Sequence, residues 1–256
     1  MGVLNITPDS FFDGGRYKND TQILSQVEKM LTEGATFIDV GAYSSKPGAI
    51  HISEDEELKR IVPVIDLLLK NFPEIILSID TFRSKVAQET IHTGAAIIND
   101  ISGGKMDNDM FATVANLKVP YILMHMQGTP QNMQQNPIYE DVTKEIIFFF
   151  AEQIRKLQQL MVNDIIIDIG FGFGKTIDHN FEILKNLELF KSLDAPILAG
   201  ISRKSMLYKT LGISAQEALN ATTSANTIAL LNGAHILRVH DVKEAMEAVK
   251  IVSQVL

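Results

Sequence analysis

Short runs of apolar residues recur eight times along the chain, and within each run the apolar positions are nearly continuous rather than alternating with polar ones. Strands that are buried on both faces have this pattern, because neither face meets water. Stretches with apolar residues at helical spacing separate the runs, as at Ile23, Val27 and Met30. This alternation predicts a parallel sheet with a helix between successive strands. We place the strands at Gly2–Asn5, Phe37–Gly41, Ile75–Asp80, Ala95–Asn99, Tyr121–His125, Ile165–Asp168, Pro196–Gly200 and Ile236–Val239, and the longest helix at about Glu140–Met161.

Eight strand–helix units match a closed (β/α)8 barrel, and the length of 256 residues is close to the ~250 typical of that fold. An open, doubly wound sheet is the structural alternative, in which ligand-binding groups gather at one switch point in the strand order. Here polar residues end nearly every apolar run, which favours the barrel, because barrel active sites form from the carboxyl ends of many strands. We therefore predict an α/β fold, a (β/α)8 TIM barrel, as a single domain over residues 1–256. The polar residues at or beside the run ends are Asn5, Asp39, Asp80, Asn99, Asp100, His125, Asp168, Arg238 and His240.

Composition narrows the class of protein. Hydrophobic residues make up 46% and charged residues 21%, so the chain can bury a large core, and the lack of cysteine excludes disulfides and thiolate metal sites. The net charge of −8 argues against a nucleic-acid partner, and no apolar stretch reaches the ~18 residues that span a bilayer. With no signal-peptide pattern, we expect a cytoplasmic protein without membrane contact. Because a barrel usually has a covered base, we also expect further residues before Met1.

Three polar side chains at run ends form the main candidate site: Asp80, Asn99 and Asp168. Each should be largely buried, and a buried carboxylate without a partner is costly. One interpretation gives them structural partners, such as a lysine or a backbone N–H. The other, which we favour, gives them a ligand with several N–H donors in one plane, because a carboxylate can accept two parallel N–H bonds. Such a ligand would be a guanine-like or pterin-like heterocycle.

Three loops could complete a ligand pocket. The segment Asn5–Gly15 contains two phenylalanines, Phe11 among them, which either close over a ligand or tuck under the barrel rim. The segment Ala42–Gly48 is equally compatible with a plain surface turn. The run Gly170–Thr176 reads GFGFGKT, but its glycine spacing fits neither a Walker loop nor a dinucleotide-binding motif. We interpret it as a flexible loop in which Phe173 supplies an aromatic wall.

Two clusters of polar residues indicate an anion site. Ser202–Ser205 follows the seventh predicted strand and opens a helix, whereas Arg238 and His240 follow the eighth. In barrels the loops after strands seven and eight are the usual phosphate site, and arginine can bind phosphate through two parallel hydrogen bonds. Solvated charges on the rim are the plainer alternative. No histidine pair has the spacing of a zinc site, but Mg²⁺ that arrives with a phosphorylated substrate needs only one or two protein oxygens, such as that of Asn5.

Seven segments occur in the order and spacing of one known family: NITPDSFFDGG, SIDTFR, AAIINDISG, MHMQGTP, DIGFGFGKT, GISRKSM and LRVHDV. With them, nearly the whole chain closely resembles the dihydropteroate synthases of folate biosynthesis. That family condenses a pterin methyl diphosphate with p-aminobenzoate and releases diphosphate. The resemblance implies a transferase with these two small-molecule substrates, with Mg²⁺, and with sulfonamides as mimics of p-aminobenzoate. It also implies a homodimer, and one predicted helix has a face of small residues that would permit close packing: Ala218, Ala221, Ala225 and Ala229.

The resemblance further implies roles for individual residues. The pterin would be held by Asp80, Asn99, Met124, Asp168 and Lys204. The diphosphate would be held by Asn5, Arg238 and His240, with Mg²⁺ beside Asn5. The p-aminobenzoate pocket would be lined by Phe11, Pro47, Phe173 and Ser205, and the closing loops would use Asp13, Ser45 and Lys46. Catalysis would depend on Asp80, Asp168, Lys204 and Arg238.

Two positions depart from the family pattern. The family's second loop commonly reads GESTRPG, whereas Gly41–Gly48 reads GAYSSKPG, so Lys46 keeps the charge but lacks the paired hydrogen bonds of arginine. Ile169 stands where proline is common. Two other functions remain as alternatives: a pterin-binding methyltransferase that passes a methyl group to a corrinoid, and a catalytically inactive pterin-binding module. The presence of the expected diphosphate-site residues favours the synthase over both.

Overall fold

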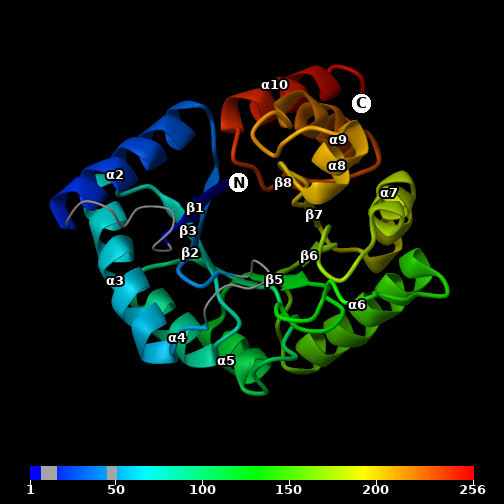
Figure 1. The fold of residues 1–256 in the computed structure, drawn as a ribbon. Coiled ribbons are helices and arrows are strands. Elements are labelled where there is room, and N and C mark those ends of the chain that lie inside the picture. Colours follow the sequence, from blue (N-terminus) through cyan, green and yellow to red (C-terminus); the bar gives the residue numbers. More distant parts are fainter. Residues whose placement is uncertain (7–15, 45–50) are drawn as a thin grey trace.

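Eight parallel strands form a closed barrel at the centre of the protein (Figure 1), which confirms the predicted fold. The computed structural model describes residues 1–6, 16–44 and 51–256, without the side chains of residues 16–19. Neighbouring strands follow chain order, and the barrel closes where the Val3 N–H donates to the Val239 carbonyl at 3.1 Å. The strands are β1 (Gly2–Asn5), β2 (Phe37–Gly41), β3 (Ile76–Asp80), β4 (Ile97–Asp100), β5 (Tyr121–Met124), β6 (Ile165–Asp168), β7 (Ile197–Ala199) and β8 (Ile236–Leu237).

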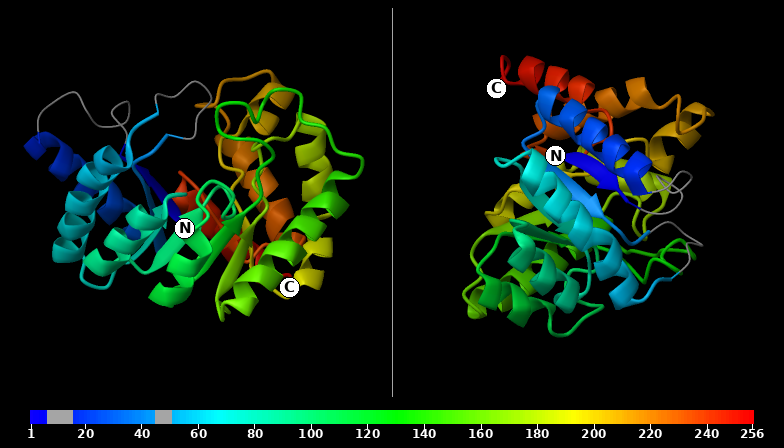
Figure 2. Two further views of the ribbon diagram at one scale, coloured as in Figure 1. Left: turned by 90° about the horizontal axis from the view of Figure 1, so that it is seen from below. Right: turned by 90° about the vertical axis from the view of Figure 1, so that its left-hand side faces the viewer.

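Helices surround the strands as an outer layer, which the two side views make plain (Figure 2). The predicted longest helix is α6, two residues shorter than expected at each end. Across the described ranges, no helix is long and apolar enough to cross a membrane. The helical segments are α2 (Arg16–Thr32), α3 (Glu54–Asn71), α4 (Ser84–Thr93), α5 (Met110–Leu117), α6 (Val142–Gln159), α7 (Ile177–Lys185), η1 (Leu187–Leu193), α8 (Ser205–Leu211), α9 (Leu219–Leu231) and α10 (Val242–Val252).

The parallel register places several strand ends at one height. Asn5 pairs with Gly41, Gly41 with Asp80, and Asp80 with Asn99. Residues two apart on a strand point to the same face, so Asp39 and Gly41 share one face of β2. Polar groups from β1 to β4 therefore meet at the carboxyl end of the barrel.

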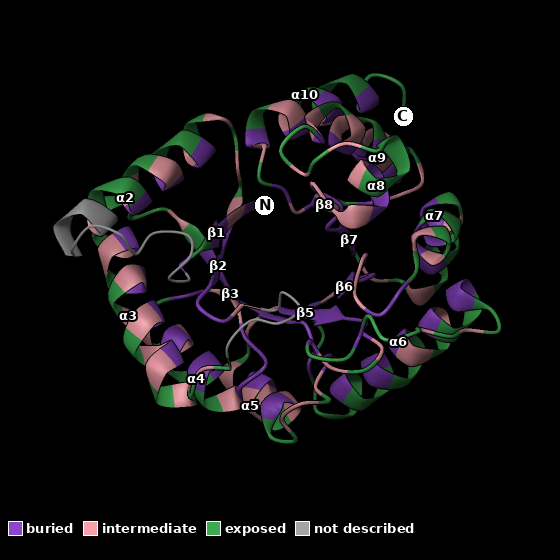
Figure 3. Ribbon diagram, in the orientation of Figure 1, coloured by how far each residue is buried: buried purple, intermediate pink, exposed green. Residues whose placement is uncertain are grey.

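Apolar residues fill two separate layers. The main core lies between strands and helices and contains strand residues such as Ile38 and Ile79, which are fully buried. A smaller cluster of Ile97, Ile122 and Leu198 occupies the other face of the strands, inside the barrel. Colouring by burial shows buried residues along the strands and on the surrounding helices, with exposed residues also on the helices (Figure 3). Because the inner cluster lies near the amino ends of its strands, the carboxyl end of the barrel interior is left to polar side chains.

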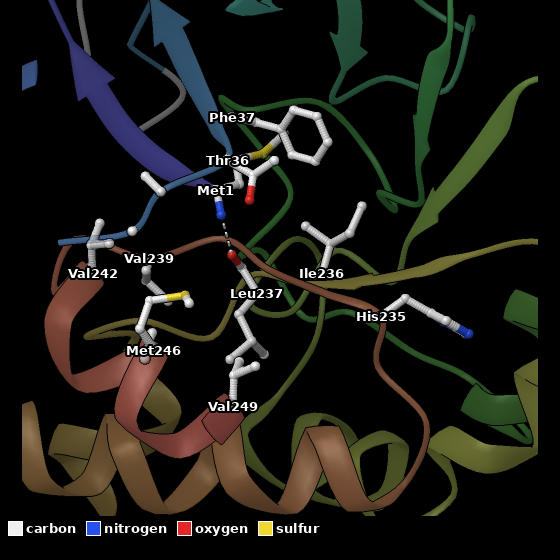
Figure 4. A pocket seen from close by; sticks show the side chains of 13 residues that line it. Met1, Thr36, Phe37, His235, Ile236, Leu237, Val239, Val242, Met246 and Val249 are labelled. Carbon is white, nitrogen blue, oxygen red and sulfur yellow. Dashed lines mark hydrogen bonds between the residues drawn. The ribbon is translucent and has the colours of Figure 1, made fainter. Parts of the chain in front are cut away.

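A cavity of about 210 Å³ lies at the opposite end of the barrel, against β1, β2 and β8 (Figure 4). Its lining is largely apolar and includes Phe37 and Ile236, the first residues of their strands, with Met246 and Val249 of α10. None of the predicted site residues lines it. This cavity is therefore distinct from the candidate site.

The face of small residues on α9 packs inside the molecule. Ala218, Ala225 and Ala229 are buried, the last two against the main core, and Ala221 also contacts that core. The close packing that this face permits is therefore used within the chain. The small side chains let α9 approach its own barrel closely. The exposed large apolar residues of α9 are Ile228 and Leu231.

Candidate active site

Five charged or amide side chains occupy the carboxyl end of the barrel, and we call them the polar layer: Asp39, Asp80, Asn99, Asp168 and Arg238. They come from β2, β3, β4 and β6 and from the residue after β8. The sequence predicts four of them for a ligand site, and the structure brings those four together around the fifth, Asp39.

Arg238 is the cation at the centre of the polar layer. Its Nη2 lies 2.7 Å from Asp168 Oδ2, and its Nε lies 3.9 Å from Asp39 Oδ2. Gly200 makes room for the guanidinium, because a Cβ at that position would lie 3.1 Å from Nη2. Burial lowers the pKa of Arg238, but Asp168, Asp39 and Asp80 outweigh burial and raise the pKa above its ordinary value. Arg238 therefore remains charged within a surplus of carboxylates.

Asp39 has a role that the sequence interpretation missed. Its carboxylate accepts hydrogen bonds from Ser78 Oγ at 2.7 Å and from Asn99 Nδ2 at 2.9 Å. Burial raises the pKa of Asp39, and the nearby Arg238 opposes that change. The signal was present, since Asp39 interrupts an apolar run as Asp80 does. Its hydrogen bond to Asn99, however, joins residues 60 positions apart and has no local signature.

The carboxylates of Asp168 and Asp80 differ in the hydrogen bonds that they accept from the protein. Asp168 is fully buried, and its Oδ1 accepts a hydrogen bond from the Gly170 N–H at 2.8 Å. Asp80 is half-buried, and within the described residues its carboxylate has no hydrogen-bond partner. Burial, with a smaller effect of Asp39, raises the pKa of Asp80 well above its ordinary value. A protein partner thus satisfies one oxygen of the Asp168 carboxylate, whereas no hydrogen bond from the described residues satisfies the carboxylate of Asp80.

Unsatisfied polar atoms concentrate in the polar layer. Four buried side-chain atoms in the described part of the chain have no hydrogen-bond partner, and three belong to this layer: Asn99 Oδ1, Asp168 Oδ2 and Arg238 Nη1. The ion pair of Asp168 and Arg238 is close, but its angles are not those of a hydrogen bond. Leaving a buried polar group unpaired costs about 1–3 kcal/mol. Asn99 Oδ1 as a free acceptor, with the unbonded Asp80 carboxylate and the ion-paired Asp168 Oδ2, suits a planar ligand rich in N–H groups.

An apolar cluster lies beside the polar layer at the same end of the barrel. Met124 is fully buried at the end of β5 and pairs in register with Asp168, which joins the two surfaces. Phe173, from the loop after β6, packs against this cluster and is half-buried. Such a wall could stack on the flat face of a heterocycle. The other members are Tyr43, Phe82, Ile101, Met126 and Met133, with Ile52 and Met106 at its edge.

Lys204 joins the loop after β7 to the loop after β6. Its Nζ donates a hydrogen bond to the Phe171 carbonyl and lies 4.7 Å from the centre of the Phe173 ring. Burial lowers the pKa of Lys204 to about 7, although Asp168 opposes this change. Its ammonium can therefore lose a proton near neutral pH.

The side chains of the segment Ser202–Ser205 make contacts with different parts of the protein. Arg203 turns away from the barrel opening, and its guanidinium binds both oxygens of Asp241 at 2.8 and 2.9 Å. Ser202 Oγ contacts His240 Nδ1 at 3.0 Å and accepts from the His240 N–H at 3.2 Å. The expectation that both cations of this segment form an anion site is wrong for Arg203, because Asp241 already pairs with it. Ser205 is half-buried as the first residue of α8.

Asn5 ends β1 at the rim of the barrel. A Cβ on Gly41 would lie 3.5 Å from Asn5 Oδ1 and 3.4 Å from Asp80 Oδ2, so the glycine lets the two oxygens approach. A single amide oxygen fits an Mg²⁺ ion that takes its other ligands from phosphate and water. Across the described ranges, no group of three or more metal-binding side chains is present. The predicted loop residues Phe11, Asp13, Ser45, Lys46 and Pro47 lie outside the described residues.

Comparison with known proteins identifies the family. The pterin binding enzyme family matches residues 1–240. Dihydropteroate synthase of Escherichia coli (strain K12) is 42% identical over 258 residues, which cover 100% of this chain and 91% of that protein. The crystal structure of Yersinia pestis dihydropteroate synthase in complex with a sulfonamide drug has a TM-score of 0.92 and 42% identity, covering 99% of this chain and 92% of the other. Xanthomonas albilineans dihydropteroate synthase with 4-aminobenzoic acid has a TM-score of 0.92 and 34% identity, covering 99% and 91%. The chain thus belongs to the pterin binding enzyme family, among the dihydropteroate synthases.

Proposed function

We propose that this protein is a dihydropteroate synthase of folate biosynthesis. It joins 6-hydroxymethyl-7,8-dihydropterin diphosphate to p-aminobenzoate and releases 7,8-dihydropteroate and diphosphate. The observation that carries the proposal is the set of buried atoms without a hydrogen-bond partner at Asn99, Asp168 and Arg238, which matches the needs of an N–H-rich heterocycle. A relative from Xanthomonas albilineans, 32% identical, has been solved in complex with 7,8-dihydropteroate.

The pterin would lie between the polar layer and the apolar cluster. Asp168 and Asp80 accept N–H bonds from the amino-amide edge of the ring, and Asn99 adds a third acceptor. Lys204 in its ammonium form donates to the carbonyl and N5 edge. Met124 packs against the face of the ring. These assignments rest on where the side chains lie and on the atoms among them that have no hydrogen-bond partner in the protein.

The reaction needs placement and charge stabilisation more than proton abstraction. The bond between the exocyclic methylene carbon and the diphosphate oxygen breaks, and its electron pair leaves with diphosphate. The lone pair of the aminobenzoate nitrogen then forms the C–N bond, and the nitrogen releases a proton to solvent. That aniline nitrogen is already neutral at pH 7, so no strong general base is required. The positive charge of Arg238, with Asn5 and His240 at the rim, would offset the charge that develops on the leaving group.

Mg²⁺ is part of the proposal, with Asn5 as its protein ligand. Bound there, the ion would neutralise part of the charge on the leaving diphosphate. We expect an excess of EDTA to abolish diphosphate release and added Mg²⁺ to restore it. Full turnover in EDTA would exclude a metal requirement without touching the rest of the proposal.

We also propose a homodimer, with a partner surface on α7 and α9. These helices contact each other and expose Phe181, Ile228 and Leu231, which are 37%, 45% and 47% accessible. Apolar side chains of this size on adjacent helices are typical of a subunit interface. The surface lies on the outside of the barrel, so dimerisation would leave the polar layer accessible to substrates. The cytoplasmic location that the sequence favours stays a prediction.

The function is tested by mixing the purified protein with the pterin diphosphate and p-aminobenzoate. We expect diphosphate release and dihydropteroate in equal amounts, each dependent on both substrates and suppressed by a sulfonamide. Tight pterin binding without diphosphate release would instead indicate an inactive pterin-binding module. Methyl transfer from a methylated folate to a corrinoid, with no diphosphate release, would indicate the methyltransferase alternative.

A further inference from the structure

Lys175 is a buried lysine with no carboxylate beside it. Its side chain ends in the interior at 3% exposure, and no acidic oxygen of the described residues lies within 4 Å of its Nζ. The amine instead meets three carbonyl oxygens, those of Gly170 at 2.9 Å, Phe173 at 3.1 Å and His125 at 3.3 Å. It also contacts His125 Nδ1 at 2.9 Å. Burying an amine is costly, so this arrangement calls for an explanation beyond filling space.

The three carbonyls belong to a turn and to the strand end against which the turn packs. Gly170, Gly172 and Gly174 have φ values of 68°, 80° and 62°, so the chain alternates through the left-handed region. A Cβ on Gly170 would lie 2.0 Å from the His125 carbonyl oxygen. The turn from Gly170 to Gly174 is thus pressed against the end of β5, and two of its carbonyls, those of Gly170 and Phe173, point inward at the Lys175 amine.

The outer side of the same turn contacts two residues of the proposed pterin site. The Gly170 N–H donates to Asp168 Oδ1, and the Phe171 carbonyl accepts from Lys204 Nζ. The Phe173 ring lies 4.7 Å from that amine. A shift of the turn would therefore move the hydrogen-bond partners of Asp168 and Lys204 together.

We propose that Lys175 is a positioning residue: its amine fixes the Gly170–Gly174 turn so that the turn holds Asp168 and Lys204 in place for the pterin. Lys175 itself contacts no substrate. Both protonation states of the amine keep at least two N–H groups, enough for the Gly170 and Phe173 carbonyls, so the role does not depend on its charge. The inference rests on the proposed function, because its main readout is synthase activity.

The absence of cysteine from the sequence allows a test that changes only the amine. Lys175→Cys would be alkylated in denaturant and then refolded, in one portion with 2-bromoethylamine and in another with 1-bromopropane. The first restores a side chain of lysine length that ends in an amine, and the second gives the same shape ending in a methyl group. Lys185→Cys, exposed at the end of α7, receives both treatments as the matched control.

We expect the aminoethyl form to regain kcat/KM for the pterin diphosphate to within about threefold of the untreated enzyme. The propyl form should remain at least tenfold lower, because its turn has lost the shared donor, while both control proteins keep full activity. Activities are compared at a temperature where circular dichroism shows every sample folded. A purely structural role would lower the Tm of the propyl form but leave its kcat/KM equal to that of the aminoethyl form, and that result would overturn the proposal.

Hydrogen exchange of the amides from Phe171 to Lys175 tests the positioning role of Lys175 without relying on synthase activity. Faster exchange in the propyl form than in the aminoethyl form supports fixation of the turn even if the untreated protein makes no dihydropteroate. Equal exchange and equal activity would refute the positioning role while the synthase activity stands.

Discussion

At the scale of single residues, two ligand-facing side chains of the polar layer, Asn99 and Asp168, are oriented by hydrogen bonds to protein partners. Asn99 donates an amide N–H to Asp39, which leaves its oxygen free, and Asp168 accepts the Gly170 N–H with Oδ1 while Oδ2 lies 2.7 Å from Arg238 Nη2. These oxygen atoms are therefore held in position before a ligand arrives. Such fixed dipoles are worth more than mobile ones, because the protein does not reorganise when the ligand binds.

Asp168→Asn tests the pterin assignment. The amide keeps an oxygen for the Gly170 N–H but loses the charge that would receive the pterin N–H groups. A hydrogen bond to a charged group contributes about 1.5–3 kcal/mol, so calorimetry should show binding of the pterin diphosphate weaker by about 10–100-fold. Asp164→Asn, just before the same strand at its exposed opposite end, should bind like the original protein. A change below threefold in Asp168→Asn would remove Asp168 from the pterin site.

The pH dependence should reveal Lys204. Its pKa is lowered to about 7 by burial, so the charged ammonium dominates below that pH and gives way to the neutral amine, a weaker donor, above it. We expect kcat/KM for the pterin diphosphate, which reports the free enzyme, to fall about tenfold per unit as pH rises above about 7. Lys204→Arg stays charged, so its lower activity should show no such fall. A wild-type profile that is flat between pH 6 and 9 would contradict this role.

At the scale of elements, the loop after β6 is better defined than its sequence suggests. A run with three glycines predicts flexibility, yet every glycine in Gly170–Gly174 adopts positive φ and the turn packs against β5 and Lys204. The glycines are needed for close approach rather than for motion. This packing could not be predicted, because the spacing of glycines cannot show that a buried amine lies beneath them.

Gly170→Ala and Gly212→Ala form a matched pair for this point. Both glycines have nearly the same φ, 68° and 66°, but a Cβ on Gly170 meets a carbonyl at 2.0 Å and one on Gly212 meets nothing within 4 Å. Gly212→Ala should cost about 1–2 kcal/mol of unfolding free energy from backbone strain alone. Gly170→Ala should cost at least about 2 kcal/mol more, because the strand end must shift. Urea unfolding measures both, and equal losses would mean that the turn yields easily.

At the scale of the whole molecule, the fold could be predicted because a polar residue marks the end of most of the apolar runs that form strands. Asp80, Asn99 and Asp168 interrupt apolar runs, and parallel topology alone brings such ends to one rim. Partners within the site could not be predicted in the same way. The hydrogen bonds of Asn99 to Asp39 and of Lys175 to His125 span 60 and 50 residues. Each joins residues that lie on or after different strands of the barrel, so no local pattern records them.

Assembly of two subunits can be tested through the exposed side chains of α9. If α7 and α9 form the interface, Ile228→Glu places a charge in a desolvated contact and should convert a dimer to a monomer in sedimentation equilibrium. Ile251→Glu changes a more exposed isoleucine on α10, at 68% accessibility, and should leave the mass unchanged. A monomeric original protein would refute the homodimer, and a dimer that survives Ile228→Glu would place the interface elsewhere.

Closure of the barrel through β1 and the end of β8 affects how the chain can be made in a cell. The partner of Met1 N is the carbonyl of Leu237, 236 residues later, so β1 waits for this neighbour until the rest of the barrel has been synthesised. At a synthesis rate of roughly 5–20 residues per second, that delay is about 10–50 s. During this time one edge of β1 offers unpaired backbone groups to any other strand, which is a known route to aggregation. Nascent chains should therefore depend on holding chaperones until Val239 has left the ribosome.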